Sequence, residues 1–430
     1  MNLICLGLFF AAFDFGTAFS KPEAWEETAV DFTVEHASEG FKFASAKREA
    51  VVNMTKGATC WNGLSIWEAR LFYPKANEGP SRIELSLYNR GDDRLAQGLS
   101  EEEFLTMRAQ IEKILSAQTK PEEPAKKKLR TGGFSHALIW SKARRAARLD
   151  WGTTGGKARG REVDFVRLTL YRGTSAAGRE KAKSQGPISG VAAKAKVKKN
   201  VRKNDSKDVW IANVPMVDQG QKGYCAAAVV ERVLRYYGQT IDEHEIAQMA
   251  GTTAERGTSV DEMIETVKAV GSKFRLGFNS IVSLGGNVNE LETEVEQYNR
   301  AAKAMKEREL ALSDYILGNM IYVSELRGAM KPKVLKRMRT KDARYKKFLA
   351  GVKTQVDQGV PVIWGVTLGI FPEPGVMQSI GGHMRLIIGY NNETHEILYT
   401  DTWGAGHELK RMPEDWAFTI THDAFFLRPL

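Results

Sequence analysis

The chain has 430 residues and a formal net charge of +10. A common domain has roughly 150 residues, so this length predicts about two to three domains rather than one compact unit. With 43% hydrophobic and 27% charged residues, the composition is typical of a soluble globular protein and excludes a disordered or membrane-embedded one. The sequence contains only three cysteines, which excludes a disulfide framework and a cysteine-rich zinc module.

The N-terminal segment has the pattern of an exported protein. Leu3–Phe13 is an apolar run that is too short to span a bilayer but has the length of a signal-peptide core. Ala18 and Ser20 supply the small residues that a signal peptidase requires. We therefore expect a signal peptide over residues 1–20 and an exported, periplasmic or extracellular protein, although Asp14 interrupts the run and no Lys or Arg precedes it. The alternative is a buried N-terminal strand or helix. No later stretch is apolar enough for a membrane span.

Residues 30–173 are expected to form a small α+β domain built from two related halves. The tripeptide Ala-Arg-Leu occurs at residues 69–71 and again at 147–149. Each copy is followed by a stretch of alternating polar and apolar residues, at 82–88 and 166–171, which predicts a strand with one buried face. Recurrence at a constant separation indicates an internal duplication.

A basic stretch of low complexity follows this domain. Residues 174–207 contain ten Lys or Arg side chains against Glu180 and Asp205, so most of the excess charge of the chain lies here. We expect residues 174–208 to be a flexible linker that charge repulsion keeps extended. The alternative is a polybasic arm for nucleic acid or lipid headgroups. Because no aromatic residues interleave for base stacking, we expect no specific nucleic-acid partner.

The residues that can carry chemistry lie in the C-terminal domain, which is expected over residues 209–430. Cys225 opens a run of alanines and regularly spaced apolar residues that predicts a helix ending at Gly238. A thiol at a helix N-terminus has a lowered pKa, because the helix dipole stabilises the thiolate. Gln219 precedes it across a glycine-containing turn, and its side-chain NH2 and the Cys225 N–H could both donate to an oxyanion. Alone, Cys225 could equally be a buried structural residue.

A histidine and an acid follow on predicted strands. His383 comes directly after two glycines at the start of an apolar strand, and a further strand ends at Asp401. The hairpin brings these two side chains together, and a carboxylate can orient an imidazole that acts as a general base for Cys225. The other histidines of this domain are expected to be structural or solvent-facing; they are His244, His395, His407 and His422.

Together these segments resemble the papain-like cysteine peptidase superfamily. Gln219-Gly220 with Gly223-Tyr224-Cys225 is similar to its oxyanion glutamine and nucleophile signature. Asp401-Thr402-Trp403-Gly404 resembles its Asn-Ser-Trp-Gly, with aspartate in the orienting position. A Cys-His-Asp set resembles the bacterial double-glycine (peptidase C39-like) branch. The resemblance implies an α+β papain-like domain, with a helical half that carries the cysteine and an antiparallel sheet half that carries His383 and Asp401.

The sequence departs from that family at two places. Ala226-Ala227-Ala228 replaces the aromatic and small residues that usually follow the cysteine, and a charged helical insertion is expected over residues 286–350. No transporter spans accompany the domain, as they do in leader-processing relatives. The substrate pocket and Gly-Gly cleavage specificity therefore do not follow from the resemblance.

The leading hypothesis is a secreted cysteine peptidase that acts on a protein or peptide substrate without metal or cofactor. Cys225 attacks the carbonyl, His383 transfers the proton, Asp401 orients the imidazole and Gln219 binds the oxyanion. One alternative is a transglutaminase-like or amide-hydrolysing acyl transferase, for which the same triad serves. The other is an inert secreted binding protein whose N-terminal module recognises a partner. The N-terminal domain is either an inhibitory pro-region or a recognition module.

Overall fold

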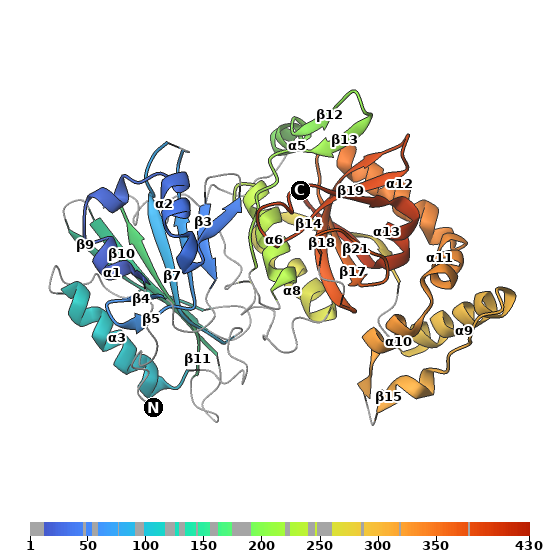
Figure 1. Ribbon diagram of the computed structural model, residues 1–430, viewed down its shortest axis with the longest axis horizontal. Helices are drawn as coiled ribbons and strands as arrows, with labels where there is room; N and C mark the ends of the chain where they lie inside the picture. Colours follow the sequence, from blue (N-terminus) through green and yellow to red (C-terminus); the bar gives the residue numbers. More distant parts are fainter. Residues whose placement is uncertain are drawn as a thin grey trace.

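The structure is a computed structural model, and its helices and strands form two domains with separate hydrophobic cores (Figure 1). It describes the following residues: 13–45, 49–53, 59–75, 77–90, 99–116, 125–128, 134–142, 145–154, 162–173, 191–219, 224–239, 246, 260–284, 288–317, 320–376 and 379–430. The predicted mixed α+β class is confirmed.

The N-terminal domain contains an eight-stranded antiparallel sheet with the order β2-β3-β6-β7-β11-β10-β9-β8. Each half of the sheet is a four-stranded meander, and each follows a helix, α2 (Ala29–Glu35) or α3 (Glu101–Ser116). The fourth strands of the two halves pair at the centre. The strands are β2 (Lys42–Ser45), β3 (Glu49–Asn53), β6 (Glu68–Phe72), β7 (Arg82–Asn89), β8 (Ala125–Lys128), β9 (Phe134–Lys142), β10 (Arg145–Thr154) and β11 (Glu162–Tyr171).

Alternation along the strands gives this sheet one apolar and one polar face. Ile83 and Leu85 of β7 are fully buried in the domain core, as the period of two predicts. The polar face is also largely buried: Glu68, Arg70 and Ser86 expose 2%, 4% and 6% of their surfaces. Buried charge on the second face of a sheet indicates that something polar covers it.

The core of the N-terminal domain begins before residue 21. Phe15 in α1 (Phe15–Ala18) is fully buried, and Phe19 packs against Trp25 with ring centroids 5.3 Å apart. The short strand β1 (Phe13–Asp14) pairs with β4 (Thr59–Trp61), which also pairs with β5 (Leu64–Ser65). Residues 13–20 are therefore part of the domain, whereas we expected them in the signal peptide and expected the domain to begin at residue 30. Residues 1–12 lie outside the described residues.

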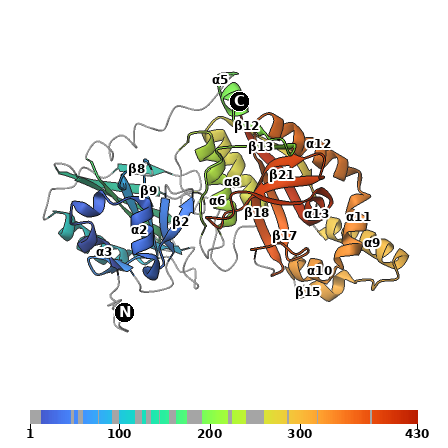
Figure 2. The same cartoon turned by 45° about the horizontal axis from the view of Figure 1, so that its top comes forward.

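The C-terminal domain contains a second antiparallel sheet, β12-β13-β18-β17-β21-β14; in addition, β19 pairs with β18, and β20 pairs with β19. Helices α6 (Cys225–Tyr236) and α8 (Val260–Lys273) lie between this sheet and the N-terminal domain (Figures 1 and 2). The strands are β12 (Val201–Lys203), β13 (Asp208–Ile211), β14 (Leu276–Ser283), β17 (Val362–Leu368), β18 (Gly381–Asn391), β19 (Glu396–Thr400), β20 (Lys410–Pro413) and β21 (Thr421–Pro429).

The prediction of a flexible linker over residues 174–208 is wrong for its second half. Helix α5 (Val191–Lys198) is followed by β12, which pairs with β13 and so joins the C-terminal sheet. Val197 is buried in the core of that domain. A few apolar positions among the lysines therefore suffice to order this stretch, and residues 174–190 lie outside the described residues.

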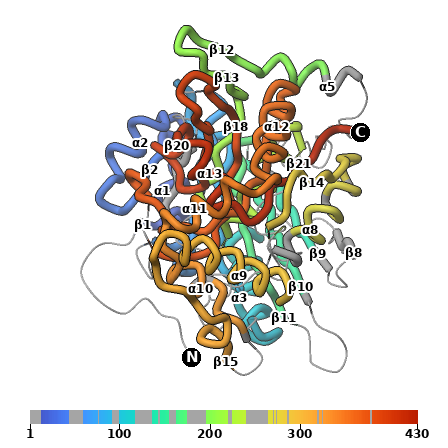
Figure 3. Tube along the Cα trace, turned by 90° about the vertical axis from the view of Figure 1, so that its right-hand side faces the viewer, coloured from blue at the N-terminus to red at the C-terminus, as the bar shows by residue number. Residues whose placement is uncertain are grey.

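The expected charged insertion is a folded helical unit that ends earlier than residue 350. It contains α9 (Val288–Ala304), β15 (Ile316–Leu317), β16 (Met320–Ile321), α10 (Val323–Ala329) and α11 (Pro332–Thr340), which lie in front in Figure 3. Buried Glu294 binds Arg327 at 3.1 Å and Arg339 at 2.5 Å. Helix α12 (Ala343–Asp357) packs against β14 and β18 of the C-terminal sheet and is not part of the insertion. Helix α13 (Glu414–Ile420) leads into β21. None of the helices among the described residues is long and apolar enough to cross a membrane.

Candidate active site

Cys225 is the first residue of helix α6 and is partly buried. Burial raises the pKa of its thiol, but a hydrogen bond with His383, the positive charge of that ring and a hydrogen bond with the Met384 backbone together lower it. The net pKa lies below that of an ordinary cysteine. The predicted location at a helix N-terminus is therefore accompanied by a neighbour that stabilises the thiolate.

His383 lies on β18 opposite Val366 of β17 and is buried. Its Nε2 is 2.5 Å from Oδ1 of Asp401, which leaves Nδ1 for the Cys225 thiol. The ring stacks on the Trp403 indole, with centroids 4.4 Å apart and planes 10° from parallel. Burial lowers the pKa of the imidazole, but the Asp401 carboxylate and Cys225 raise it to about 9. The ring is therefore held in place and favoured in its charged form.

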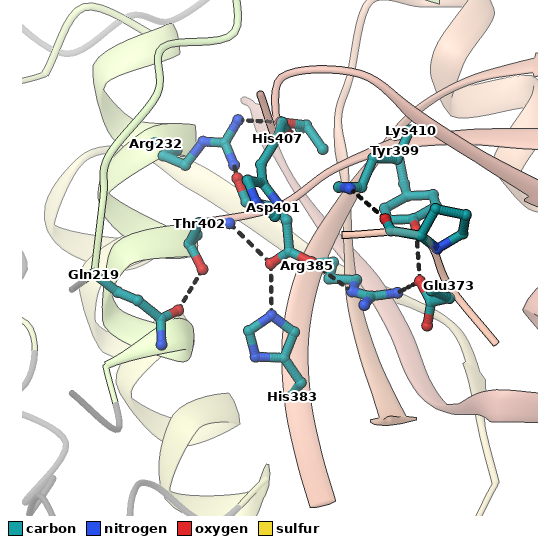
Figure 4. Close-up of polar contacts among 12 residues, drawn as sticks. Gln219, Arg232, Glu373, His383, Arg385, Tyr399, Asp401, Thr402, His407 and Lys410 are labelled. Carbon is teal, nitrogen blue, oxygen red and sulfur yellow. Dashed lines mark hydrogen bonds and ion pairs between the residues drawn. The ribbon is translucent and has the colours of Figure 1, made fainter. Parts of the chain in front are cut away.

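Asp401 directly follows β19 and is fully buried (Figure 4). Its Oδ1 also accepts a hydrogen bond from the Thr402 N–H at 2.9 Å, and its Oδ2 is 2.8 Å from Nε of Arg385. Burial raises the pKa of this carboxyl, but the charges of His383 and Arg385 hold it well below its usual range. Asp401 is thus an anion with a partner at each oxygen.

Gln219 is attached to the same segment from the other side. Its backbone N–H donates to the carbonyl oxygen of Thr402 at 2.8 Å, and its side-chain oxygen accepts a hydrogen bond from the Thr402 hydroxyl. Because the amide oxygen is held in this way, the NH2 group is directed away from Thr402, toward the side on which His383 lies (Figure 4). The structure thus brings together all four residues that the sequence selected, since Cys225 contacts His383 and Gln219 lies across Thr402 from Asp401.

Arg385 is a buried positioning residue that the sequence analysis missed. Its Nη1 binds Glu373 at 2.7 Å, and Glu373 also accepts a hydrogen bond from the Tyr399 hydroxyl at 2.5 Å. Arg385 follows His383 by two positions on one strand, so both side chains project from the same face of the sheet. The sequence contained one signal for Arg385, which is a charged residue two positions after His383 in an otherwise apolar strand.

Arg232 of α6 connects the helix of Cys225 to the end of β19 and to Asp401. It is buried, and its guanidinium donates to the Asp401 carbonyl oxygen at 2.6 Å and to the Thr400 hydroxyl at 2.6 Å. A third hydrogen bond, at 2.7 Å, ends on the Pro215 carbonyl oxygen. Burial lowers the pKa of this guanidinium to about 10. Arg232 was not predicted from the sequence, because its partners are distant along the chain.

The other histidines have different surroundings. His395 is exposed and lies 3.2 Å from Glu414, and His407 meets the Trp403 ring edge-on. His422 is half-buried against Arg327, where desolvation and that charge lower its pKa well below the usual value. His244 lies outside the described residues. Among the residues that the structure describes, no group of His, Cys, Asp and Glu could hold a metal ion.

Comparison with known families decides the class of this domain. Residues 213–280 match the Peptidase C39 family, and residues 287–421 match the Peptidase C39-like family. The C-terminal half is a C39-like cysteine peptidase domain. The predicted family is therefore confirmed, and its two matches meet near the start of the helical insertion. No curated protein sequence matches the chain.

Solved structures that are similar to this chain share little sequence identity with it. The peptidase domain of Streptococcus ComA, a bifunctional ABC transporter involved in quorum sensing, is 14% identical with a TM-score of 0.26, covering 51% of this chain and 100% of that one. Xylellain, a cysteine protease from Xylella fastidiosa, is 13% identical with a TM-score of 0.28, covering 58% and 97%. The Saccharomyces cerevisiae Ran-binding protein Mog1p is 12% identical with a TM-score of 0.15, covering 33% and 74%.

Proposed function

We propose that this protein is an exported cysteine peptidase that hydrolyses peptide bonds with a Cys225-His383-Asp401 triad and an oxyanion donor at Gln219. The observation that carries the proposal is the position of the His383 ring. Its Nε2 lies 2.5 Å from the Asp401 carboxylate, and the ring is near enough to the Cys225 thiol to lower the pKa of that thiol. A helix-terminal thiolate next to an oriented imidazolium is the arrangement that acyl transfer from a peptide requires.

The proposed reaction has two halves. The Cys225 sulfur attacks the peptide carbonyl carbon, and the negative charge that develops on oxygen is bound by the Gln219 NH2 and the Cys225 backbone N–H. His383 then gives its proton to the leaving amine, and a thioester remains. In the second half His383 removes a proton from water, the hydroxide attacks the thioester, and the carboxylate product leaves as the thiol is restored. Asp401 keeps the imidazole in one tautomer throughout.

Hydrolysis of fluorescein-labelled casein tests this proposal. We expect Cys225→Ala to abolish hydrolysis, and Gln219→Ala to lower kcat by roughly 10² to 10³ with little change in KM, because the oxyanion donor acts in the transition state. Cys60→Ala is the matched control and should hydrolyse casein like the wild type. Full activity in Cys225→Ala, or equal loss in both cysteine variants, would contradict the proposed nucleophile.

We also propose that the N-terminal domain arose by duplication. Both halves consist of a helix followed by four antiparallel strands, which supports this origin. The repeated tripeptides at residues 69–71 and 147–149 lie on β6 and β10, which are the third strand of each half. Export rests on the apolar run Leu3–Phe13 alone.

A further inference from the structure

We propose that the N-terminal domain is a positioning part of the active site, because it holds both ends of the segment 218–224. This segment carries the oxyanion glutamine and leads into the nucleophile, so the inference rests on the proposed function. It differs from both roles that the sequence left open for this domain, an inhibitory pro-region and a recognition module. Residues 220–223 lie outside the described residues, and the contacts that support the inference are at Asp218 and Tyr224.

One peptide group is hydrogen-bonded to both domains. Its carbonyl oxygen, which belongs to Asp218, accepts a hydrogen bond from Nη2 of Arg70 on β6 at 3.0 Å. Its N–H, which belongs to Gln219, donates to Thr402 next to the catalytic aspartate at 2.8 Å. Arg70 and Gln219 are both buried. Rotating this peptide plane leaves a buried polar group unpaired, which costs about 1–3 kcal/mol. The N-terminal domain therefore fixes the backbone from which the Gln219 side chain projects.

The side chain of Asp218 strengthens this contact. Its carboxylate is 98% buried, with 2% exposed, and lies 2.9 Å from Nζ of Lys42 on β2. Glu68 forms an ion pair with Arg70 and so holds the guanidinium that binds the Asp218 carbonyl oxygen. A carboxylate is stable away from water only when it is paired, so separation of the domains would expose or strand the charge of Asp218.

The other end of the segment is held by Tyr224, the residue before the nucleophile. Its hydroxyl donates to the Asn89 side-chain oxygen, at the end of β7, at 2.7 Å. Tyr224 and Asn89 expose 1% and 4% of their surfaces. Tyr224 is also the N-cap of α6, so this contact sets where the helix begins and hence where the Cys225 thiol and N–H lie.

Helix α6 continues along the polar face of the N-terminal sheet, which carries Arg70, Phe72 and Glu84. Arg235, in the last turn of α6, lies 5.8 Å from the Phe72 ring centroid. Burial raises the pKa of Glu84, but Arg82, Arg167 and Arg235 together lower it. The interface is therefore polar and specific in register, while the two hydrophobic cores stay separate. This contact accounts for the buried charges on the second face of the sheet.

The inference predicts which step depends on the domain contact. Acylation of Cys225 passes through an oxyanion and needs Gln219 in place, whereas alkylation by iodoacetamide needs only the thiolate. In the full-length protein, Arg70→Met should lower the rate of acylation by p-nitrophenyl acetate about tenfold and leave the pH profile of alkylation between about pH 5 and pH 9 unchanged. Arg70→Lys should restore most of the acylation rate, because lysine can still donate to the Asp218 carbonyl oxygen.

Tyr224→Phe provides a second variant that removes only one hydroxyl group and should also slow acylation. Its matched control is Tyr236→Phe on the same helix, whose hydroxyl donates to the Gly359 carbonyl oxygen at 2.9 Å inside the C-terminal domain. Arg145→Met, which removes a hydrogen bond to the Ser20 carbonyl oxygen within the N-terminal domain, is the control for Arg70→Met. Both controls should acylate like the wild type.

The outcomes separate this inference from the proposed function. Acylation at the wild-type rate in Arg70→Met and Tyr224→Phe would overturn the inference. Faster acylation in these two variants would also overturn it and would show that the N-terminal domain inhibits the enzyme. Parallel losses of acylation and alkylation that Arg70→Lys does not rescue would also overturn it, because they indicate general misfolding. A wild type whose Cys225 is neither acylated nor alkylated faster than a free cysteine would overturn the proposed function, and this inference with it.

Discussion

At the scale of single residues, the buried charges of His383 and Asp401 set the reactivity of the Cys225 thiol. The pKa of Cys225 is lowered, that of His383 is raised to about 9, and that of Asp401 is held well below its usual range. A lowered thiol pKa next to a raised imidazole pKa favours the thiolate–imidazolium form of the pair, with Asp401 as the counter-ion of the ring. Because the causes are mutual, removing one charge changes the titration of the others.

The pH profile of kcat/KM follows from these shifts. We expect activity to decline above about pH 9, where His383 loses the proton that it must give to the leaving amine. Asp401→Asn removes the charge that raises the His383 pKa, so this alkaline limb should move to lower pH. The same measurement on His407→Gln, a neighbour outside the triad, should give the wild-type limb. An alkaline limb that is identical in Asp401→Asn would contradict the assigned ion pair.

Stability gives a second readout of the same pair. A group whose folded-state pKa is raised contributes stability that is fully present below its unfolded pKa of about 6.5 and is lost as pH rises through the folded value. The His383 contribution should therefore disappear as pH approaches and passes about 9. The thermal midpoint of the wild type should fall more over this interval than that of Asp401→Asn.

At the scale of elements, the loop after β19 depends on two glycines with left-handed backbone. Gly404 has φ +77°, and a Cβ there would meet Oδ2 of Asp218 at 2.6 Å; Gly406 has φ +87° and open space around it. The first glycine is therefore required by both conformation and contact, and the second by conformation alone. The contact is with the residue that precedes Gln219, so the glycine of the Asp-Thr-Trp-Gly segment is linked to the proposed oxyanion donor.

We expect Gly406→Ala to cost about 1–2 kcal/mol of unfolding free energy, which is the ordinary price of a left-handed alanine. Gly404→Ala should lower the thermal midpoint further and slow acylation of Cys225, because Asp218 must move. Differential scanning calorimetry and the p-nitrophenyl acetate assay measure the two effects. Equal midpoints and equal acylation rates in the two variants would show that the approach of Asp218 has no consequence.

The elements also show what the sequence can predict. Helix α6 and strand β18 were predictable because their apolar patterns and flanking glycines are local signals, and with them the places of Cys225 and His383. Arg232 and Arg385 were not predicted because their partners lie in other segments of the chain, and no local pattern encodes that pairing. The order of residues 191–208 was missed because lysine content outweighed the few apolar positions that join the stretch to the sheet.

At the scale of the whole molecule, two domains with separate cores lie side by side (Figure 2) and meet through polar contacts near Cys225. The alternating residues of the N-terminal domain predicted strands with one buried face. The polar face is also covered, because it lies against α6 and the segment of Gln219, through Arg70 and Asn89. Sequence periodicity cannot distinguish a polar face that meets water from one that meets a polar partner, because both use the same residue types.

The integrity of this arrangement depends on where the mature chain begins. Cleavage after Ser20 would remove Phe15 and Phe19, whose side chains are buried, and with Phe19 the carbonyl oxygen that accepts the Trp25 indole hydrogen bond at 2.9 Å. It would also remove Asp14, which accepts a hydrogen bond from the Asn62 backbone at 2.9 Å. Deleting a buried phenylalanine side chain costs about 3–5 kcal/mol. The folded N-terminal domain therefore requires residues that a twenty-residue leader would discard.

We accordingly expect the mature protein to retain Phe15, with any processing before Phe13, and intact-mass measurement of the exported protein checks this. Two shortened chains provide the physical test. A chain that starts at Phe13 should keep the thermal midpoint of the longer protein, whereas one that starts at Lys21 should unfold its N-terminal domain several degrees lower, since about 1 kcal/mol shifts the midpoint of a domain this size by a few degrees. Because Arg70 and Asn89 belong to that domain, the shorter chain should also acylate Cys225 more slowly. A fully stable and active protein that begins at Lys21 would contradict both the assignment of residues 13–20 to the core and their link to the active site.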